Sequence, residues 1–219
     1  MDVRQPSRIR VLLAGATGLV GGHCLTKLLA DDEIDQITVL ARRPLELTHP
    51  KLTVRVVDFD HLREQAGTVK ADAALCCLRT THRASASPEA FAKVDHICVA
   101  ELAKLAATRG VPRFILVSAV VADASSPVFY NRVKGRAEAA VSELPFKTVH
   151  LLRPSLLLGE RAEPRPVEDW SKQFAPFWSL FAWGPFSAYR PVPAETVAAK
   201  MVELAKSDEE GVYIHYFKG

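Results

Sequence analysis

Short, continuously apolar runs alternate with longer amphipathic stretches along most of the 219-residue chain. The apolar runs predict six β-strands, at residues 9–14, 37–41, 52–57, 73–78, 113–118 and 148–153. Apolar residues at helical spacing predict one helix after the first strand and further helices over about 88–108 and 130–144. Strands that are apolar on both faces are typical of a parallel sheet covered by helices on both sides. The pattern therefore predicts an α/β fold with a doubly wound parallel sheet of the Rossmann type.

The last quarter of the chain departs from this alternation because it is rich in aromatic residues. Segment 167–189 contains all three tryptophans and eight of the seventeen aromatic side chains. We expect a single domain over residues 1–219, in which residues 160–200 form a small helical cap on the substrate or partner side. Three interpretations of the aromatic segment stay open: a packed helical cap, a substrate lid, or a surface for a protein partner or self-association. A last strand is expected at 212–216.

Charge and composition exclude several classes of function. The net charge is only +3 and no block of lysine and arginine stands out, so a nucleic-acid partner has no electrostatic support. No uninterrupted apolar stretch approaches the length of a membrane span, and the seven histidines share no ligand spacing, so we expect neither a membrane span nor a metal site. Cys76 and Cys77 lie in an apolar run, and the four cysteines form no C-x-x-C motif, which favours reduced thiols in a cytoplasmic protein. Arg8 and Arg10 could open a secretory signal, but the glycines that follow would make a poor apolar helix.

Three glycines follow the first predicted strand, and each has a physical role in a nucleotide-binding turn. Gly15 turns the chain, Gly18 lets the backbone approach a pyrophosphate, and Gly21 lets the next helix pack closely on the strand. The amino-terminal end of that helix would then face a phosphate group. The spacing is G-x-x-G-x-x-G rather than the more usual G-x-G-x-x-G, so the sequence predicts a dinucleotide without deciding which one.

The residues at the end of the second predicted strand favour NADP(H) over NAD(H). In this fold, the side chain at that place reads the ribose of the adenosine half. Arg42 and Arg43 stand there instead of an acidic residue, and a guanidinium offers charged donors to a 2′-phosphate. Asp58, at the end of the third predicted strand, would contact the adenine amino group or, equally, cap a helix or turn.

Tyr130 and Lys134 form a candidate catalytic pair. They are four residues apart at the start of a predicted helix, so both side chains point into the same space. A phenol titrates near pH 10, so proton transfer at neutral pH requires help, and a nearby ammonium supplies it by stabilising the phenolate. The alternative is an ordinary tyrosine–lysine pair on a helix surface.

Together these motifs resemble the atypical short-chain dehydrogenase/reductases, and within them the branch of the human Tat-interacting oxidoreductase. The resemblance covers about residues 9–202. It is carried by the glycine turn, the arginine and tyrosine–lysine pairs, and the runs at 57–58, 76–81, 94–95, 110–118, 122–126 and 153–155.

The resemblance implies that NADPH is held by three parts of the chain and that Tyr130 transfers a proton. Lys134 would assist Tyr130 and hold the nicotinamide ribose, while Ser118 would polarise the substrate. The further cofactor contacts implied are Thr17, Gly18, Leu19, Val20, Arg42, Arg43, Leu78, Arg79, Leu157 and Arg165.

Two departures from the family pattern bear on catalysis. The run of serines that many members carry beyond the fifth strand is reduced here to Ser118, and Ser125 and Ser126 are rival candidates closer to Tyr130. Asp95 stands where many members have a structural asparagine. Both changes leave cofactor binding intact as an expectation and put the efficiency of catalysis in question.

The leading hypothesis is an NADPH-dependent oxidoreductase that reduces a small carbonyl or quinone-like substrate. The alternative is an NADPH-binding regulatory or assembly protein with little or no turnover, in which the cofactor sets the shape of the aromatic segment. An epimerase or dehydratase that recycles its cofactor is a weaker third hypothesis, because the arginine pair favours NADPH.

Overall fold

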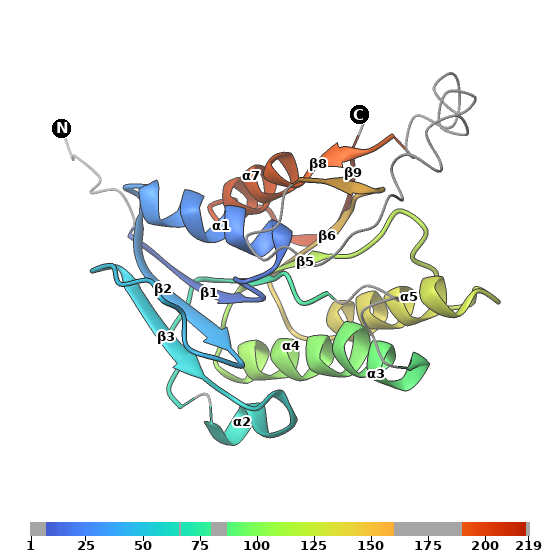
Figure 1. Cartoon of the computed structure of the whole chain (residues 1–219), viewed down its shortest axis with the longest axis horizontal. Coiled ribbons are helices and arrows are strands. Elements are labelled where there is room, and N and C mark those ends of the chain that lie inside the picture. The colour runs from blue at the N-terminus through green and yellow to red at the C-terminus, as the bar shows by residue number, and fades with distance from the viewer. Residues whose placement is uncertain (1–7, 66, 80–86, 160–189, 218–219) are drawn as a thin grey trace.

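A parallel β-sheet forms the centre of the molecule. The computed structural model describes residues 8–65, 67–79, 87–159 and 190–217 (Figure 1). The strands of the main sheet are β1 (Ile9–Ala14), β2 (Ile34–Ala41), β3 (Leu52–Val56), β4 (Ala73–Cys76), β5 (Arg113–Val117), β6 (Thr148–Arg153) and β9 (Gly211–Tyr216). Two short strands, β7 (Leu157–Leu158) and β8 (Val192–Pro193), pair separately.

The strand order is β3-β2-β1-β4-β5-β6-β9, and every neighbouring pair is parallel. This order confirms the predicted doubly wound sheet. The chain moves outward in one direction from β1 to β3 and then crosses back to β4, so the order reverses between β1 and β4. In such sheets, ligands bind outside the carboxyl ends of the strands at this reversal.

Helices cover both faces of the sheet because the strands bury side chains on both sides. In β1, Leu13 belongs to one apolar core and Leu12 to the other. Figure 1 shows helices packed against both faces of the sheet. The first face carries α1 (Leu19–Ala30) and α7 (Ala194–Leu204). The other carries α2 (Leu62–Gln65), α3 (Pro88–Ala92), α4 (Val99–Thr108) and α5 (Phe129–Ser142), with short turns η1 (Phe59–His61) and η2 (Lys93–Cys98).

The helix predicted over 88–108 is one continuous rod with a wider π-helical turn in its middle. Ser87 caps its start by accepting a hydrogen bond from the Ala90 amide, and Pro88 occupies the first turn, where no amide donor is required. The π-helical stretch η2 then joins α3 to α4. Such widened turns occur frequently at functional sites, and periodicity does not reveal them.

Element ends differ from the predicted ones by two or three residues. Strand β2 begins at Ile34 rather than residue 37, because buried Ile34 continues the pairing with Ile9. Strand β4 ends at Cys76 rather than residue 78.

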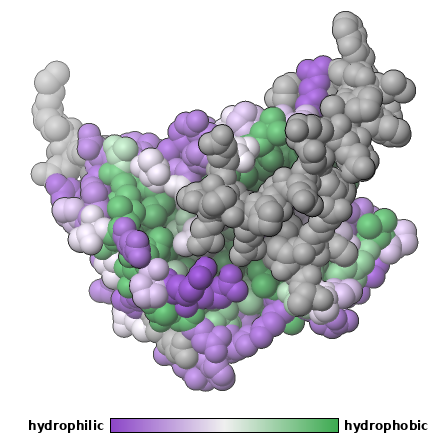
Figure 2. All heavy atoms as spheres, in the orientation of Figure 1, coloured by the Kyte–Doolittle hydropathy of each residue, from purple (hydrophilic) through white to green (hydrophobic). Residues whose placement is uncertain are grey.

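Apolar side chains reach the surface over β2 and β3 (Figure 2), where Val56 is 54% exposed. None of the described helices is long and apolar enough to cross a membrane.

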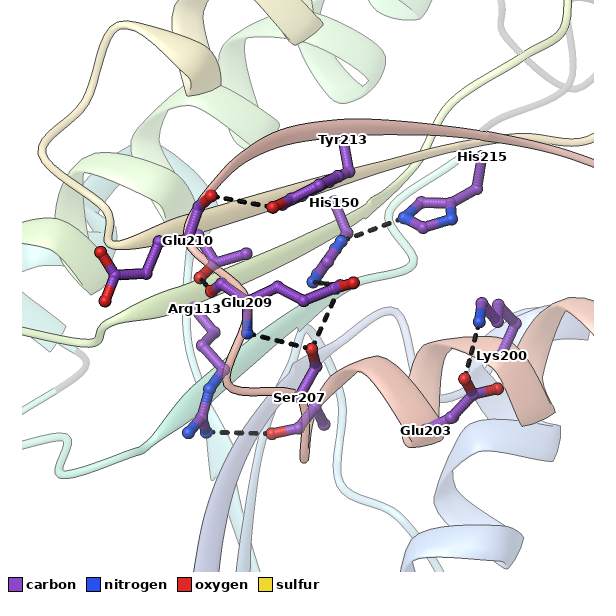
Figure 3. A network of polar contacts seen from close by, with 11 residues as sticks. Arg113, His150, Lys200, Glu203, Ser207, Glu209, Glu210, Tyr213 and His215 are labelled. Carbon is purple, nitrogen blue, oxygen red and sulfur yellow. Dashed lines mark hydrogen bonds and ion pairs between the residues drawn. The ribbon is translucent and has the colours of Figure 1, made fainter.

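A polar network links β9, and the loop that precedes it, to β5 and β6 (Figure 3). His150 of β6 is fully buried, and its Nδ1 lies 3.0 Å from Nε2 of His215. Its ring stacks on Tyr213 with the centroids 5.4 Å apart. Burial, followed by the neighbouring His215, lowers the pKa of His150 to about 4, so its imidazole is neutral at physiological pH. Arg113 donates to Asp208 at 3.1 Å and ties the loop before β9 to β5.

Candidate functional site

The glycine turn brings three pieces of backbone into direct contact at the carboxyl end of β1. Gly15 has φ +87°, a conformation that favours glycine. A Cβ atom on Gly15 would lie 2.5 Å from the carbonyl oxygen of Cys77, just beyond β4, and one on Gly21 would lie 2.0 Å from the Gly15 carbonyl oxygen. Any side chain at either position would therefore push α1 or β4 away from the turn. The geometry agrees with the predicted turning role of Gly15 and packing role of Gly21.

The amino-terminal end of α1 has the features of an anion site. Gly18 is its N-cap residue, no side chain caps the helix, and the first turn carries no acidic residue. The first helical hydrogen bond runs from the Gly22 amide to the Gly18 carbonyl at 2.8 Å, so the preceding amides have no partner within the helix. Those amides and the helix dipole favour a negatively charged group. A Cβ on Gly18 would lie 3.2 Å from the Gly15 carbonyl, so a larger residue would narrow this cradle.

The arginine pair follows β2 on the same edge of the sheet. Arg42 and Arg43 are both exposed, and within the described part of the chain neither guanidinium has a hydrogen-bond or ion-pair partner. Because β1 and β2 are parallel neighbours, the pair lies on the sheet edge that carries the glycine turn. Two exposed cations beside a helix amino terminus suit a ligand with several phosphates.

Residues after β3 and β4 complete this edge. The Asp58 carboxylate accepts a hydrogen bond from the Asp60 amide at 3.0 Å and caps η1, as one of its two predicted roles requires. Leu78 is half-buried and Arg79 is exposed directly beyond β4. These residues thus lie beyond the carboxyl ends of β3 and β4, on the edge of the sheet that carries the glycine turn.

Lys134 is not a surface lysine. It lies on α5 with only 2% of its side chain exposed, and its Nζ is 2.6 Å from Oδ1 of the fully buried Asp95 on η2. The contact is a charge pair rather than an aligned hydrogen bond. Tyr130, one turn earlier on α5, is half-buried, and its ring lies 5.4 Å from that of Phe91. The burial of Lys134 contradicts the alternative of an ordinary surface tyrosine–lysine pair.

The three candidate serines have different surroundings. Ser118 follows β5 directly and is 1% exposed, and within the described residues its hydroxyl has no hydrogen-bond partner. The Ser125 hydroxyl donates to Asp123 at 2.7 Å, and the Ser126 hydroxyl accepts from the Val128 amide at 3.2 Å. The two rivals thus stabilise the turn before α5, whereas the Ser118 hydroxyl is committed to no described group.

Gly135 is a site residue that the sequence reasoning missed. A Cβ there would lie 2.0 Å from the backbone nitrogen of Ala124, so the loop after β5 rests directly on α5 beside Lys134. Glycine in the interior of a helix costs about 1 kcal/mol relative to alanine and therefore needs a packing reason. A glycine directly after Lys134, inside a predicted helix, was the signal that could have identified it.

The chain beyond β6 folds back toward the glycine turn. A Cβ on Gly159 would lie 3.0 Å from the Leu19 side chain, and both Leu19 and Leu157 pack against the core on the α1 face. Leu157 thus lies in a segment that reaches the start of α1.

Arg165 and the aromatic segment 167–189 lie outside the described residues, as does most of the predicted cap. In the part of the chain that the structure describes, no three histidine, cysteine or acidic side chains form a metal-ion site.

A family model described as NAD(P)H-binding matches residues 15–155, more than half of the chain. The chain belongs to this NAD(P)H-binding family. Protein HTATIP2 of Rattus norvegicus is 36% identical to it over 206 residues, which cover 92% of this chain and 83% of that protein. A protein of Emericella nidulans named "fmp52, mitochondrial" is 34% identical over 172 residues, covering 75% of this chain and 74% of that protein. The resemblance to the Tat-interacting branch is therefore confirmed.

Solved structures share the fold at low sequence identity. A UDP-glucose 4-epimerase of Thermotoga maritima has a TM-score of 0.68 at 16% identity, over 96% of this chain and 78% of that one. A dTDP-glucose 4,6-dehydratase of Streptomyces venezuelae, solved with NAD, has a TM-score of 0.71 at 18% identity, over 96% of this chain and 76% of that one. Such likeness shows the fold alone. The family match and the shared fold together make this chain an NAD(P)H-binding protein with a doubly wound sheet.

Proposed function

We propose that this protein is an NADPH-dependent reductase of a small carbonyl or quinone-like substrate. The observation that carries the proposal is the buried ammonium of Lys134, one helical turn from Tyr130. A lysine so far from water is useful to a protein when its charge acts on a neighbouring group. Tyr130 is that neighbour along α5, and it follows the turn beyond β5 that begins with Ser118.

The described residues fit NADPH. The backbone cradle at Gly18 and the uncapped start of α1 suit the pyrophosphate, since a side chain at Gly18 would narrow the cradle and no side chain occupies the helix start. Arg42 and Arg43 would hold the 2′-phosphate. The other contacts we assign to the cofactor are Thr17, Leu19, Val20, Asp58, Leu78, Arg79, Tyr130, Lys134, Leu157 and Arg165.

The chemistry of reduction divides between cofactor and protein. NADPH, when bound, supplies the hydride for the carbonyl carbon. The Tyr130 hydroxyl donates its proton to the carbonyl oxygen, and the Lys134 ammonium stabilises the phenolate that remains. The Ser118 hydroxyl donates a hydrogen bond to the same oxygen, which orients the carbonyl.

Cofactor preference tests the role of the arginines. In a fluorescence titration, we expect Arg42→Ala/Arg43→Ala to weaken NADPH binding about 10- to 100-fold, because charged hydrogen bonds to the 2′-phosphate are lost. NADH binding should change less than about threefold. Arg109→Ala is the matched control, because Arg109 is an exposed arginine at the carboxyl-terminal end of α4, away from the glycine turn. Equal affinity of the parent protein for NADPH and NADH would contradict the assignment.

Turnover tests the proposal itself. We expect the parent to oxidise NADPH with a member of a panel of quinones, aldehydes and ketones. Tyr130→Phe should lose about 100-fold or more in kcat, while its NADPH affinity falls by about tenfold at most, since only one of many cofactor contacts is removed. Tyr213→Phe is the control, because that hydroxyl donates to the Glu210 carbonyl far from the site. A Tyr130→Phe variant as active as the parent would refute the mechanism.

A regulatory or assembly protein that binds NADPH without turnover is the second candidate. Two observations favour it: the serine run is reduced to Ser118, and Asp95 already pairs with the charge of Lys134. Tight NADPH binding by the parent with no oxidation across the panel would select this candidate, with segment 167–189 as the proposed partner surface.

We propose a cytoplasmic location from the reduced cysteines, although relatives of this chain carry "mitochondrial" in their names.

A further inference from the structure

One helical segment contacts both members of the tyrosine–lysine pair. Phe91 and Asp95 are four residues apart on the α3–η2 segment, and Tyr130 and Lys134 are four apart on α5. The Phe91 ring lies 5.4 Å from the Tyr130 ring, and Asp95 lies 2.6 Å from the Lys134 ammonium. Two matched contacts therefore link the helices, one apolar and one ionic.

The ionic contact is cut off from water. Lys134 is 2% exposed and Asp95 is not exposed at all. The Cys76 thiol of β4 also faces the pair, and burial raises its pKa to about 12, so it carries no charge near neutral pH. The next residue along, His96, faces Arg136 of α5 and Lys104 of α4, and burial together with these cations lowers its pKa. Asp95 is therefore the anion in contact with the ammonium.

A buried ammonium without a counter-ion tends to lose its proton, because desolvation penalises the charged form. An uncharged Lys134 could not stabilise a phenolate. The same helical segment offers a contrast in Lys93, whose Nζ lies 2.5 Å from Asp60 with both side chains about half exposed. Water can solvate Lys93 if Asp60 is removed, but it cannot reach Lys134.

We propose that Asp95 is a positioning residue that keeps Lys134 ionised and holds its ammonium in line with Tyr130. The catalytic consequence rests on the reductase function proposed above, whereas the effect on the charge of Lys134 does not. The π-helical turn places Asp95 for this role, because it carries a buried carboxylate toward α5 from a helix whose other face packs on the sheet.

The charge of Lys134 can be read directly. In protein labelled with ¹³C at the lysine Cε, the resonance of Lys134 is assigned as the one that Lys134→Met removes. We expect the parent resonance to keep the ammonium shift from about pH 6 to about pH 9, and that of Asp95→Asn to titrate to the neutral form within this range. Asp60→Asn is the matched control, in which Lys93 should stay charged throughout.

Two results would overturn the proposal. One is a Lys134 that stays an ammonium in Asp95→Asn over the whole range. The other is a Lys134 that already titrates in this range in the parent. The parent titration can therefore refute the proposal even if Asp95→Asn does not fold. A role of Asp95 in folding alone would leave the charge of Lys134 unchanged.

Turnover supplies an independent readout. With a substrate from the panel, we expect Asp95→Asn to have a kcat about tenfold below the parent at pH 8 and within about threefold at pH 6, where Lys134 regains its proton, with KM for NADPH nearly unchanged. An equal loss at both pH values would contradict a role through charge. A parent that never oxidises NADPH would refute the reductase function, while the resonance titration would still decide the role of Asp95.

Discussion

Two polar clusters lie on opposite faces of the sheet, and they offset the cost of removing polar groups from water in different ways. Lys134 and Asp95 bury full charges and compensate each with the other. At the β6–β9 edge, the buried ring of His150 is neutral and forms a hydrogen bond of 3.0 Å with the half-buried His215 (Figure 3). Both clusters tie two elements together, but only the first keeps charge away from water.

This contrast indicates which of the two clusters has a purpose beyond packing. A buried ion pair contributes little net stability, because desolvation offsets most of the attraction, and apolar residues of similar volume often serve as well. A neutral, hydrogen-bonded histidine pair avoids that desolvation penalty. We therefore expect changes at the ion pair to alter both stability and chemistry, and changes at the histidines to alter stability alone.

The largest expected effect is that of breaking the ion pair. Lys134→Met leaves the Asp95 carboxylate buried without its cation, and we expect the free energy of unfolding to fall by about 3 kcal/mol in a urea titration. Lys134→Met/Asp95→Leu removes both charges and should recover to within about 1 kcal/mol of the parent. If the single variant proved as stable as the parent, the pair would not be the buried charge contact that the structure shows.

Acid should weaken the histidine cluster by a smaller amount. The pKa of His150 is lowered from 6.5 to about 4, so unfolding takes up a proton in this range. The contribution of neutral His150 to the free energy of unfolding is fully present above pH 6.5 and is lost as the pH falls through 4. We expect this loss to be about 2 kcal/mol, after allowing for partial solvation of the ring. The charged groups that act on His150 are Glu209, Lys200 and Arg113. Thermal melts should show this loss.

The variant His150→Leu separates this effect from general acid denaturation. It should fall less steeply in stability between these pH values and bind NADPH as the parent does, because the histidines lie away from the glycine turn. An acid dependence identical to that of the parent would show that other groups control it. A tenfold change in NADPH affinity would remove the contrast between the two clusters.

The smallest expected effect tests the two roles of Asp58. Asp58→Ala removes the cap of η1 and should lower the free energy of unfolding by about 0.5 kcal/mol. Asp58→Asn keeps the cap and should match the stability of the parent, while NADPH affinity falls about threefold if the carboxylate also contacts the adenine amino group. An unchanged affinity in Asp58→Asn would leave Asp58 a capping residue only.

Local patterns were enough to predict the strands of the sheet and the glycine turn at the carboxyl end of β1. Apolar runs predicted six strands, and a seventh was expected near the carboxyl end; all seven are present. Gly15 and Gly21 could be assigned roles because a positive φ and a close backbone approach each demand glycine. Gly135 was missed because a glycine inside a predicted helix signals close packing without showing which segment packs there, here the loop at Ala124.

Residue types and short spacings were sufficient to predict the class of the fold, the glycine turn, and the candidate pair Tyr130 and Lys134. The burial of Lys134 and its pairing with Asp95 arise in the folded molecule, since the two residues are 39 positions apart and meet only when α5 packs on η2. Desolvation is a property of the packed molecule, so no local pattern could have predicted how the charge of Lys134 is held.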